Sequence, residues 1–369
     1  MVAPTPIVED LTARKPAALA RAISLVENGS PGSESLLAGL HARIGGARRI
    51  GITGPPGGGK STLIERLASR YRSAGLTVGV IAIDPSSPFT GGALLGDRIR
   101  MERAAGDPGV FIRSMASRGS LGGMATTTGE VADVMDAYGF DRILIETVGV
   151  GQSELDIASV CDTTIVVLVP ESGDGIQVMK AGLMEIADVY VVNKADRPGA
   201  DRLRQELEVA IGLKGGHTFR HVPAHHGVDL LAVSASMREP ASASVPPDSG
   251  APVRLSARAP GDGSGAVAWE PPVLATAAQR NEGIEELGGA LDRHFAYLER
   301  GGDLQARRGR QLAQRTRDVV ERALRRWLWS DAGPRPALEM ALADVAAGRR
   351  SPYEAAAGVV ERLRRGDGA

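Results

Sequence analysis

GITGPPGGGKST, residues 51–62, is the most informative segment of the chain. It fits the pattern G-x-x-x-x-G-K-[ST], with Gly54 as the first glycine and Gly59, Lys60 and Ser61 at the end. A strand-like apolar run precedes the segment and a helix-like run follows it, which is the setting of a phosphate-binding loop. Glycines let successive backbone N–H groups turn toward phosphate oxygens, and the helix N-terminus adds the positive end of its dipole. The segment therefore predicts a nucleotide phosphate site, the alternative being a glycine-rich turn with a chance lysine.

Short runs rich in β-branched residues flank this loop and alternate with helix-like segments. The runs lack polar alternation, as expected for strands that are buried on both faces of a sheet. They are RRIGIT (48–53), TVGVIAID (77–84), GVFIRS (109–114), RILIET (142–147), TTIVVLV (163–169), DVYVVN (188–193) and PPVLAT (271–276). This alternation predicts an α/β fold with a doubly wound, mostly parallel sheet.

Helical patterns extend the chain on both sides of this α/β region. Residues 10–44 place apolar residues at helical spacing, with a break at NGSPGS (28–33), and the chain is helical again after residue 283. Residues 239–268 are rich in Pro, Ser, Gly and Ala, and predict a flexible insertion. The predicted divisions are an N-terminal helical extension (1–45), a P-loop domain (46–298) and a C-terminal helical arm (299–369).

The segment NKAD, residues 193–196, suggests which base is bound, because it follows directly on the run DVYVV. The Asp196 carboxylate can accept two hydrogen bonds, from N1–H and from the exocyclic amine of guanine, whereas adenine offers no such pair. A turn that ends a strand is the alternative interpretation. The segment ATAA (275–278), after the next strand, is predicted to add backbone contacts to the base.

Three carboxylates are candidates for a metal site, because Mg²⁺ prefers hard oxygen ligands. Asp84 ends the second run, Asp97 lies in GGALLGDRIRM, and Glu146 ends RILIE. We expect them, together with the Ser61 hydroxyl, to hold Mg²⁺. The alternatives are a cap or turn for Asp84 and a solvated charge for Asp97. The predicted catalytic residues are Lys60, Asp97 and Glu146.

The predicted nucleotide contacts combine the phosphate loop, the base motif and two further positions. They are Gly54, Pro55, Pro56, Gly57, Gly58, Gly59, Lys60, Ser61, Thr62, Arg100, Gly149, Asn193, Lys194, Asp196, Thr276 and Ala277. A solvated helix charge is the alternative for Arg100. Many small GTPases place a water-orienting glutamine directly after the glycine that corresponds to Gly149. Here that residue is Val150, and the nearest glutamine is Gln152. We therefore expect slow hydrolysis by the chain alone, and a partner that completes the site.

Together these residues resemble the MeaB/ArgK-type P-loop GTPases, the G-protein chaperones of cobalamin-dependent acyl-CoA mutases. The stretches that carry the resemblance are GPPGGGKST, AIDPSSPFTGGALLGDRIRM, SMASRGSLGG, IETVGVGQSELDIA, ESGDGIQVMKAGLMEIADVYVVNKAD and PPVLATAAQRNEGIEEL. The resemblance implies GTP or GDP with Mg²⁺, and a role in gating adenosylcobalamin loading onto a mutase of the methylmalonyl-CoA mutase type and protecting or reactivating it.

The resemblance also implies a homodimer formed through the C-terminal arm. It implies switch regions near residues 84–100, 146–156 and 171–184. Gln152 lies in the second of these. Asp174 and Lys180 lie in the third, which resembles the element that relays the nucleotide state to the mutase. An exposed helix lysine is the alternative for Lys180.

Composition excludes several classes of protein. The formal net charge of −1, with no basic domain, argues against a nucleic-acid partner. No apolar run approaches the ~20 residues of a membrane span. The N-terminus does not have the pattern of a signal peptide, and the single cysteine, Cys161, excludes an intramolecular disulfide. We expect a cytoplasmic protein.

Two other functions stay open at this stage. One is an ATP-using kinase of the kind once assigned to ArgK, against which Asp196 argues. The other is a nickel-insertion GTPase, which would need Cys and His ligands. His217, His221, His225 and His226 cluster in the sequence, but Pro223 interrupts their helical spacing and no carboxylate cluster accompanies them.

Overall fold

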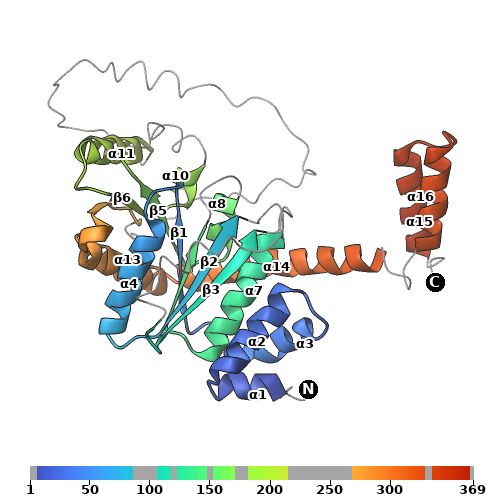
Figure 1. Ribbon diagram of the computed structural model, residues 1–369. Coiled ribbons are helices and arrows are strands. Elements are labelled where there is room, and N and C mark those ends of the chain that lie inside the picture. The colour runs from blue at the N-terminus through green and yellow to red at the C-terminus, as the bar shows by residue number, and fades with distance from the viewer. Residues whose placement is uncertain are drawn as a thin grey trace, which may run out of the picture.

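A computed structural model describes residues 6–85, 106–117, 123–147, 153–170, 182–214, 268–328 and 335–365. Its centre is one seven-stranded sheet in the order β3-β2-β4-β1-β5-β6-β7, in which every pair of strands is parallel (Figure 1). The strands are β1 (Arg48–Thr53), β2 (Val78–Pro85), β3 (Val110–Ser117), β4 (Arg142–Glu146), β5 (Thr163–Leu168), β6 (Val189–Asn193) and β7 (Val273–Thr276). All seven predicted strands are confirmed.

Helices cover both faces of this sheet, which confirms the doubly wound arrangement. α4 (Lys60–Ser73) and α13 (Ile284–Arg300) pack on one face, against Ile52 and Val80 among others. α7 (Gly123–Tyr138), α10 (Leu183–Ile186) and α11 (Ala200–Lys214) pack on the other face. Successive residues of a strand serve opposite faces, so the strands need apolar side chains at nearly every position. The remaining short elements of this region are α8 (Ser153–Asp156) and η2 (Ile157–Ser159), between β4 and β5, and η3 (Ala278–Arg280), between β7 and α13.

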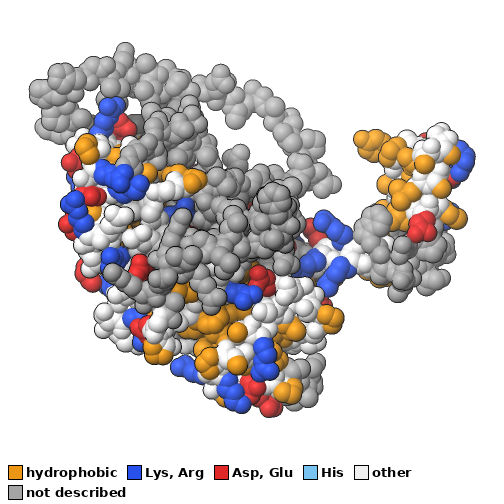
Figure 2. Space-filling model, in the orientation of Figure 1, with side chains coloured by type: hydrophobic (Ala, Val, Ile, Leu, Met, Phe, Trp, Pro, Cys, Tyr) orange, Lys and Arg blue, Asp and Glu red, His pale blue; other side chains and the backbone are white. Residues whose placement is uncertain are grey.

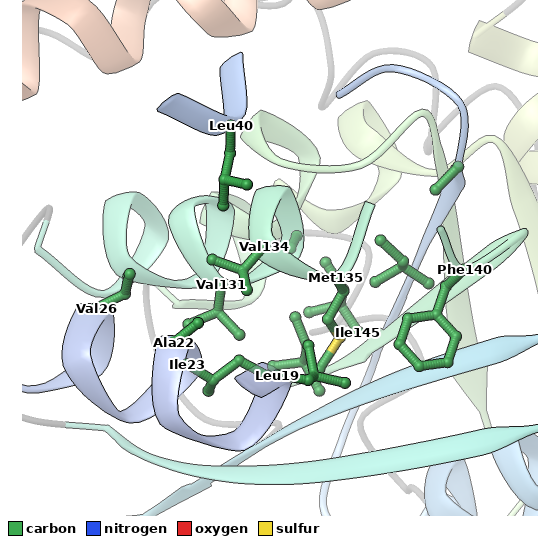
Figure 3. Packing of buried hydrophobic residues seen from close by; sticks show 14 of the residues in the cluster. Leu19, Ala22, Ile23, Val26, Leu40, Val131, Val134, Met135, Phe140 and Ile145 are labelled. Carbon is green, nitrogen blue, oxygen red and sulfur yellow. The ribbon is translucent and has the colours of Figure 1, made fainter. Parts of the chain in front are cut away.

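The N-terminal helices form a layer outside α7. They are α1 (Pro6–Thr12), α2 (Pro16–Glu27), α3 (Ser33–Leu40) and η1 (His41–Arg43). Leu19 and Ile23 of α2 lie in one buried cluster with Val131 and Met135 of α7 (Figure 3). The predicted break at residues 28–33 is confirmed. A second break, before Pro16, was not predicted, and it arises because a proline disfavours helical backbone at the residue before it.

The C-terminal region is helical, as predicted. α14 (Asp303–Leu328) leaves the body of the molecule, and α15 (Arg335–Ala346) and α16 (Pro352–Arg365) pair with each other, apart from the sheet (Figure 1). Their shared contact is small, since its buried side chains are Ala341, Ala355 and Val359. Across the ranges given above, no helix is both long and apolar enough to cross a membrane.

A buried ionic cluster fixes the start of α14 to the sheet. Both carboxylate oxygens of Asp188 accept hydrogen bonds from Arg307, at 2.9 and 3.0 Å. His294 Nε2 lies 3.3 Å from Asp188 Oδ1, and His294 Nδ1 lies 2.9 Å from the Thr163 hydroxyl. Burial opposes the charge on Asp188, but the hydrogen bonds from His294 and Arg307 outweigh it and lower the pKa of this carboxyl to about 2.

Acid is expected to weaken the fold through Asp188. Its pKa of about 2 in the folded chain lies below the ordinary 3.8, so the unfolded chain binds this proton more readily. The resulting stabilisation, about 2 kcal/mol, is fully present above pH 3.8 and is lost as the pH falls toward 2. Urea unfolding of the wild type and of Asp188→Asn at pH 6 and at pH 3 measures this. We expect their difference in unfolding free energy to shrink by about 1 kcal/mol at pH 3, whereas a constant difference would contradict the assignment.

Candidate nucleotide-binding site

The glycine-rich loop lies where the order of the strands reverses. It joins β1 to α4, and β1 lies between β4 and β5 in the sheet. In open α/β sheets, ligands bind outside the carboxyl ends of the strands at such a point. Because all the strands are parallel, Glu146, Asn193 and Thr276, which end β4, β6 and β7, lie at the same edge as the loop. The topology therefore brings the predicted phosphate, metal and base residues to one edge.

Two glycines are required where the loop passes its neighbours. Gly54 has φ 132°, and a Cβ on it would lie 2.1 Å from the carbonyl oxygen of Val167 in β5. Gly59 has φ 80°, and a Cβ on it would lie 2.4 Å from Asn193 Nδ2. Both the positive φ and the lack of space exclude a side chain at these positions. The close approach lets the loop lie directly on β5 and on the base motif.

The residues that end the loop are buried and polar. Lys60 Nζ donates hydrogen bonds to the carbonyl oxygens of Gly54 at 2.8 Å and Pro55 at 3.1 Å. The Ser61 hydroxyl donates to Glu146 Oε1 at 2.9 Å. Lys60, Ser61 and Glu146 are each at most 9% exposed. A buried hydroxyl beside a carboxylate, at a helix N-terminus, supplies the hard oxygen atoms that Mg²⁺ prefers.

A second polar pair next to Glu146 was not predicted. The Thr147 hydroxyl donates to the Thr53 hydroxyl at 2.9 Å, and both side chains are buried. This bond joins the end of β1 to the residue that follows β4. It sets the spacing between the loop and the carboxylate of Glu146. A lone threonine at each of two strand ends gives no signal in the sequence.

Asn193 connects the base motif to the phosphate loop. Its Nδ2 donates to the carbonyl oxygen of Gly58 at 2.8 Å. Its Oδ1 accepts from the Thr276 hydroxyl at 3.0 Å and from the backbone N–H of Ala278 at 3.2 Å. One buried amide therefore holds three segments that are far apart in the sequence.

Replacing Asn193 with alanine is expected to weaken GDP binding about tenfold or more, because buried partners in the phosphate loop and at the end of β7 and just after it (Gly58, Thr276 and Ala278) lose their hydrogen bonds. Asn28→Ala, at an exposed position after α2, is the matched control and should leave the affinity unchanged. Fluorescence titration with a labelled GDP measures both variants. An unchanged affinity in a folded Asn193→Ala protein would contradict the assignment.

The segment that contains Asp196 is held beside η3. Lys194 adopts a left-handed backbone with φ 56°, and the N–H of Ala195 donates to the carbonyl oxygen of Thr276 at 2.9 Å. Arg280 Nη2 lies 3.2 Å from Asp196 Oδ2. Arg66 of α4 donates to the carbonyl oxygen of Ala278 at 3.0 Å. Neither arginine was predicted, because the sequence alone does not place them against this segment.

Several predicted site residues lie outside the described ranges. They are Asp97, Arg100, Gly149, Gln152, Asp174 and Lys180, together with the four histidines of residues 217–226 and the insertion at 239–268. Asp84 lies near the end of β2, where its backbone is in register with Ala116 of β3. β2 is also the neighbour of β4, the strand that ends at Glu146. Of the predicted metal ligands, the structure brings together Ser61 and Glu146.

Comparison with known proteins agrees with this geometry. The family described as Methylmalonyl Co-A mutase-associated GTPase MeaB matches residues 19–332. A Pyrococcus abyssi protein named as a GTPase is 42% identical over 354 residues, which cover 91% of this chain and 95% of that protein. The mouse mitochondrial methylmalonic aciduria type A homolog is 45% identical over 148 residues, 40% of this chain and 36% of that protein. The crystal structure of an LAO/AO transport system kinase is similar with a TM-score of 0.62 and 25% identity, covering 97% of this chain and 96% of that one. The chain therefore belongs to the MeaB family and is a GTPase.

Proposed function

We propose that this GTPase is a chaperone of a B12-dependent acyl-CoA mutase of the methylmalonyl-CoA mutase type. In this role it gates the loading of adenosylcobalamin and protects or reactivates the mutase. The observation that carries the proposal is the match over residues 19–332 to a family named for its association with that mutase. The partial similarity to a methylmalonic aciduria type A homolog supports the same partner.

The arrangement of the site supports guanine nucleotide as the ligand. The N–H groups of residues 57–62 would surround the phosphates, and Lys60 would exchange its carbonyl contacts for phosphate oxygens. Ser61 and Glu146, with Asp84 and Asp97, would hold Mg²⁺, which when bound neutralises charge on the phosphates. Asp196 would accept from guanine, beside Thr276 and Ala277.

A binding experiment tests the choice of partner. Sedimentation of this chain with a purified methylmalonyl-CoA mutase is expected to show a complex whose affinity differs between GDP and a non-hydrolysable GTP analogue. ATP in place of GTP should have no effect, and an unrelated dehydrogenase serves as the matched negative partner. If neither nucleotide state binds any B12-dependent acyl-CoA mutase, the proposed role is wrong.

We infer that the C-terminal arm joins two copies of the chain. α14 exposes an apolar stripe that consists of Leu312, Val320, Leu324 and Trp327, spaced along one face. The hairpin of α15 and α16 also exposes apolar side chains, among them Met340 and Leu342 (Figure 2). Apolar faces on helices that extend away from the core favour an interface with another copy. Trp329, two residues beyond Trp327, lies outside the described residues.

Replacing Leu324 with glutamate is expected to weaken the dimer about tenfold or more, because it places a charge in the centre of the apolar stripe. Arg325→Glu, at the exposed neighbouring position, is the matched control and should keep the dimer. Sedimentation velocity at micromolar concentration separates the two states. A wild-type monomer at that concentration would contradict the inference.

The solved kinase relative favours one alternative, an ATP-using transfer reaction. Asp196 distinguishes the two, since its carboxylate would meet two donors on guanine and none in that arrangement on adenine. The nickel-insertion alternative has no specific observation in its favour. Within the described ranges, no group of three or more His, Cys, Asp or Glu side chains could hold a metal ion.

A further inference from the structure

Two segments of the chain return from the nucleotide edge of the sheet and end beside α14. The first contains α8 and η2, follows β4 and Thr147, and ends at Asp162 before β5. The second contains α10, follows β5, and ends at Asp188 before β6. α8 and α10 contact each other, with Leu155 beside Gly182. Both segments therefore leave the edge that carries the phosphate loop and finish at the opposite edge.

Two adjacent arginines of α14 bind the ends of these segments. Arg307 holds both carboxylate oxygens of Asp188, and it also donates to the backbone carbonyl of Asp162. Arg308 holds both carboxylate oxygens of Asp162, each at 2.7 Å. A guanidinium that donates to both oxygens of a carboxylate fixes the orientation of the two side chains as well as the distance between them. One turn further along α14, Gln311 donates to the carbonyl oxygen of Cys161 at 2.7 Å. This bond holds the residues that follow η2.

Burial makes these contacts costly to break. Asp162 is 1% exposed and Asp188 is 8% exposed. Removing one partner of such a buried pair leaves an uncompensated charge. Arg308 additionally donates to the carbonyl oxygens of Gly45 and Ala47, at 2.7 and 2.9 Å, which ties the same point to the connection between η1 and β1. A displacement of either segment that keeps these pairs intact must therefore be accompanied by a movement of α14.

We propose that Arg307 and Arg308 form a joint that couples the nucleotide state to the orientation of α14 and its apolar stripe. A change at the ends of β4 or β5 moves α8, η2 or α10, and the joint carries that movement into the arm. By thermodynamic reciprocity, engagement of the arm by a second copy then changes nucleotide affinity by the same factor. The inference rests on the guanine-nucleotide binding proposed above, and it does not depend on which mutase is the partner.

Cys161 provides a reporter for this joint in the full-length chain. It is the single cysteine of the sequence, it is fully buried, and its carbonyl is held by Gln311. Burial also raises the pKa of its thiol, so it reacts only when the surroundings open. The labelling rate of Cys161 therefore measures local opening beside Arg307 and Arg308.

The test compares wild type saturated with Mg²⁺-GDP and with a non-hydrolysable GTP analogue. We expect the Cys161 labelling rate and the amide exchange of α14 to differ about fivefold or more between the two states. Amide exchange in α2 is the internal reference for global stabilisation. Arg307→Lys and Arg308→Lys keep the positive charge but cannot donate to both carboxylate oxygens in one plane. Each variant should remove most of the difference in labelling and exchange between the two nucleotide states. Arg310→Lys, exposed on the same helix, should retain it.

Calorimetric titration of the same samples with GDP separates the possible failures. Equal rates in the two nucleotide states, with GDP binding intact, would overturn the joint alone. A difference that survives in both lysine variants would also overturn it, because coupling would then take another route. Absence of GDP binding by the wild type would overturn the proposed nucleotide site, and the joint with it.

Discussion

An alanine in place of Gly54 is expected to abolish useful nucleotide binding. Its Cβ would lie 2.1 Å from the carbonyl oxygen of Val167, at a backbone φ of 132° that L-residues rarely adopt. β5 cannot retreat, because it is paired on both sides, with β1 and β6. The loop must move instead, and a shift of about 1 Å in groups that position phosphates lowers affinity or turnover about 100-fold.

Gly57→Ala is the matched control for this substitution. Gly57 also has a positive φ, 73°, but no heavy atom lies within 4 Å of a Cβ built on it. We expect that variant to lose less than tenfold in affinity, in line with strain of about 1 kcal/mol. Titration with a fluorescent GDP, alongside thermal melting, measures both. Equal affinities in the two variants would show that the contact with β5 does not shape the loop.

Replacing Asp196 with asparagine is expected to lower GDP affinity about 100-fold or more, since two charge-assisted hydrogen bonds to guanine are affected. The side-chain amide of asparagine would place its own N–H donor opposite the N1–H or the exocyclic amine of guanine, which are also donors. Xanthine carries a carbonyl oxygen where guanine carries its amine, so the variant should bind xanthosine diphosphate better than GDP. The substitution is therefore expected to change the preferred base from guanine to xanthine, in addition to weakening the binding of GDP.

Asp201→Asn, an exposed position on α11, makes the same change of charge and should leave the preference for GDP intact. Competition between GDP, xanthosine diphosphate and ADP for each variant gives the three affinities. If ADP competes with GDP equally well on the wild type, Asp196 does not select the base, and the ATP alternative gains support.

The central strands were predictable here because they are buried on both faces. Residues such as Ile165, Val166 and Val167 serve alternate faces, so the sequence shows an unbroken apolar run. The break before Pro16 was missed because the helical spacing of Leu19 and Ile23 dominates that region. Local backbone rules override periodicity at such a point.

Site residues were predictable where they belong to a short sequence motif whose residue types indicate the ligand. Lys60, Ser61 and Asn193 could be named from short patterns, and Ser61 does meet Glu146. The Thr53–Thr147 bond and the contact of Arg280 with Asp196 join residues that no local pattern relates. Arg307 lies 119 positions from Asp188, and on an arginine-rich helix it resembles any solvated charge. Pairings over such distances emerge only from the packed structure.

Nucleotide turnover tests the central claim most directly. Hydrolysis of GTP and of ATP is measured with and without a purified methylmalonyl-CoA mutase. We predict slow GTP hydrolysis that the mutase accelerates, with ATP inert, because Val150 stands in the sequence where many small GTPases carry the water-orienting glutamine, and because we propose that Asp196 selects guanine. ATP turnover that is as fast as GTP turnover and indifferent to the mutase would contradict this account.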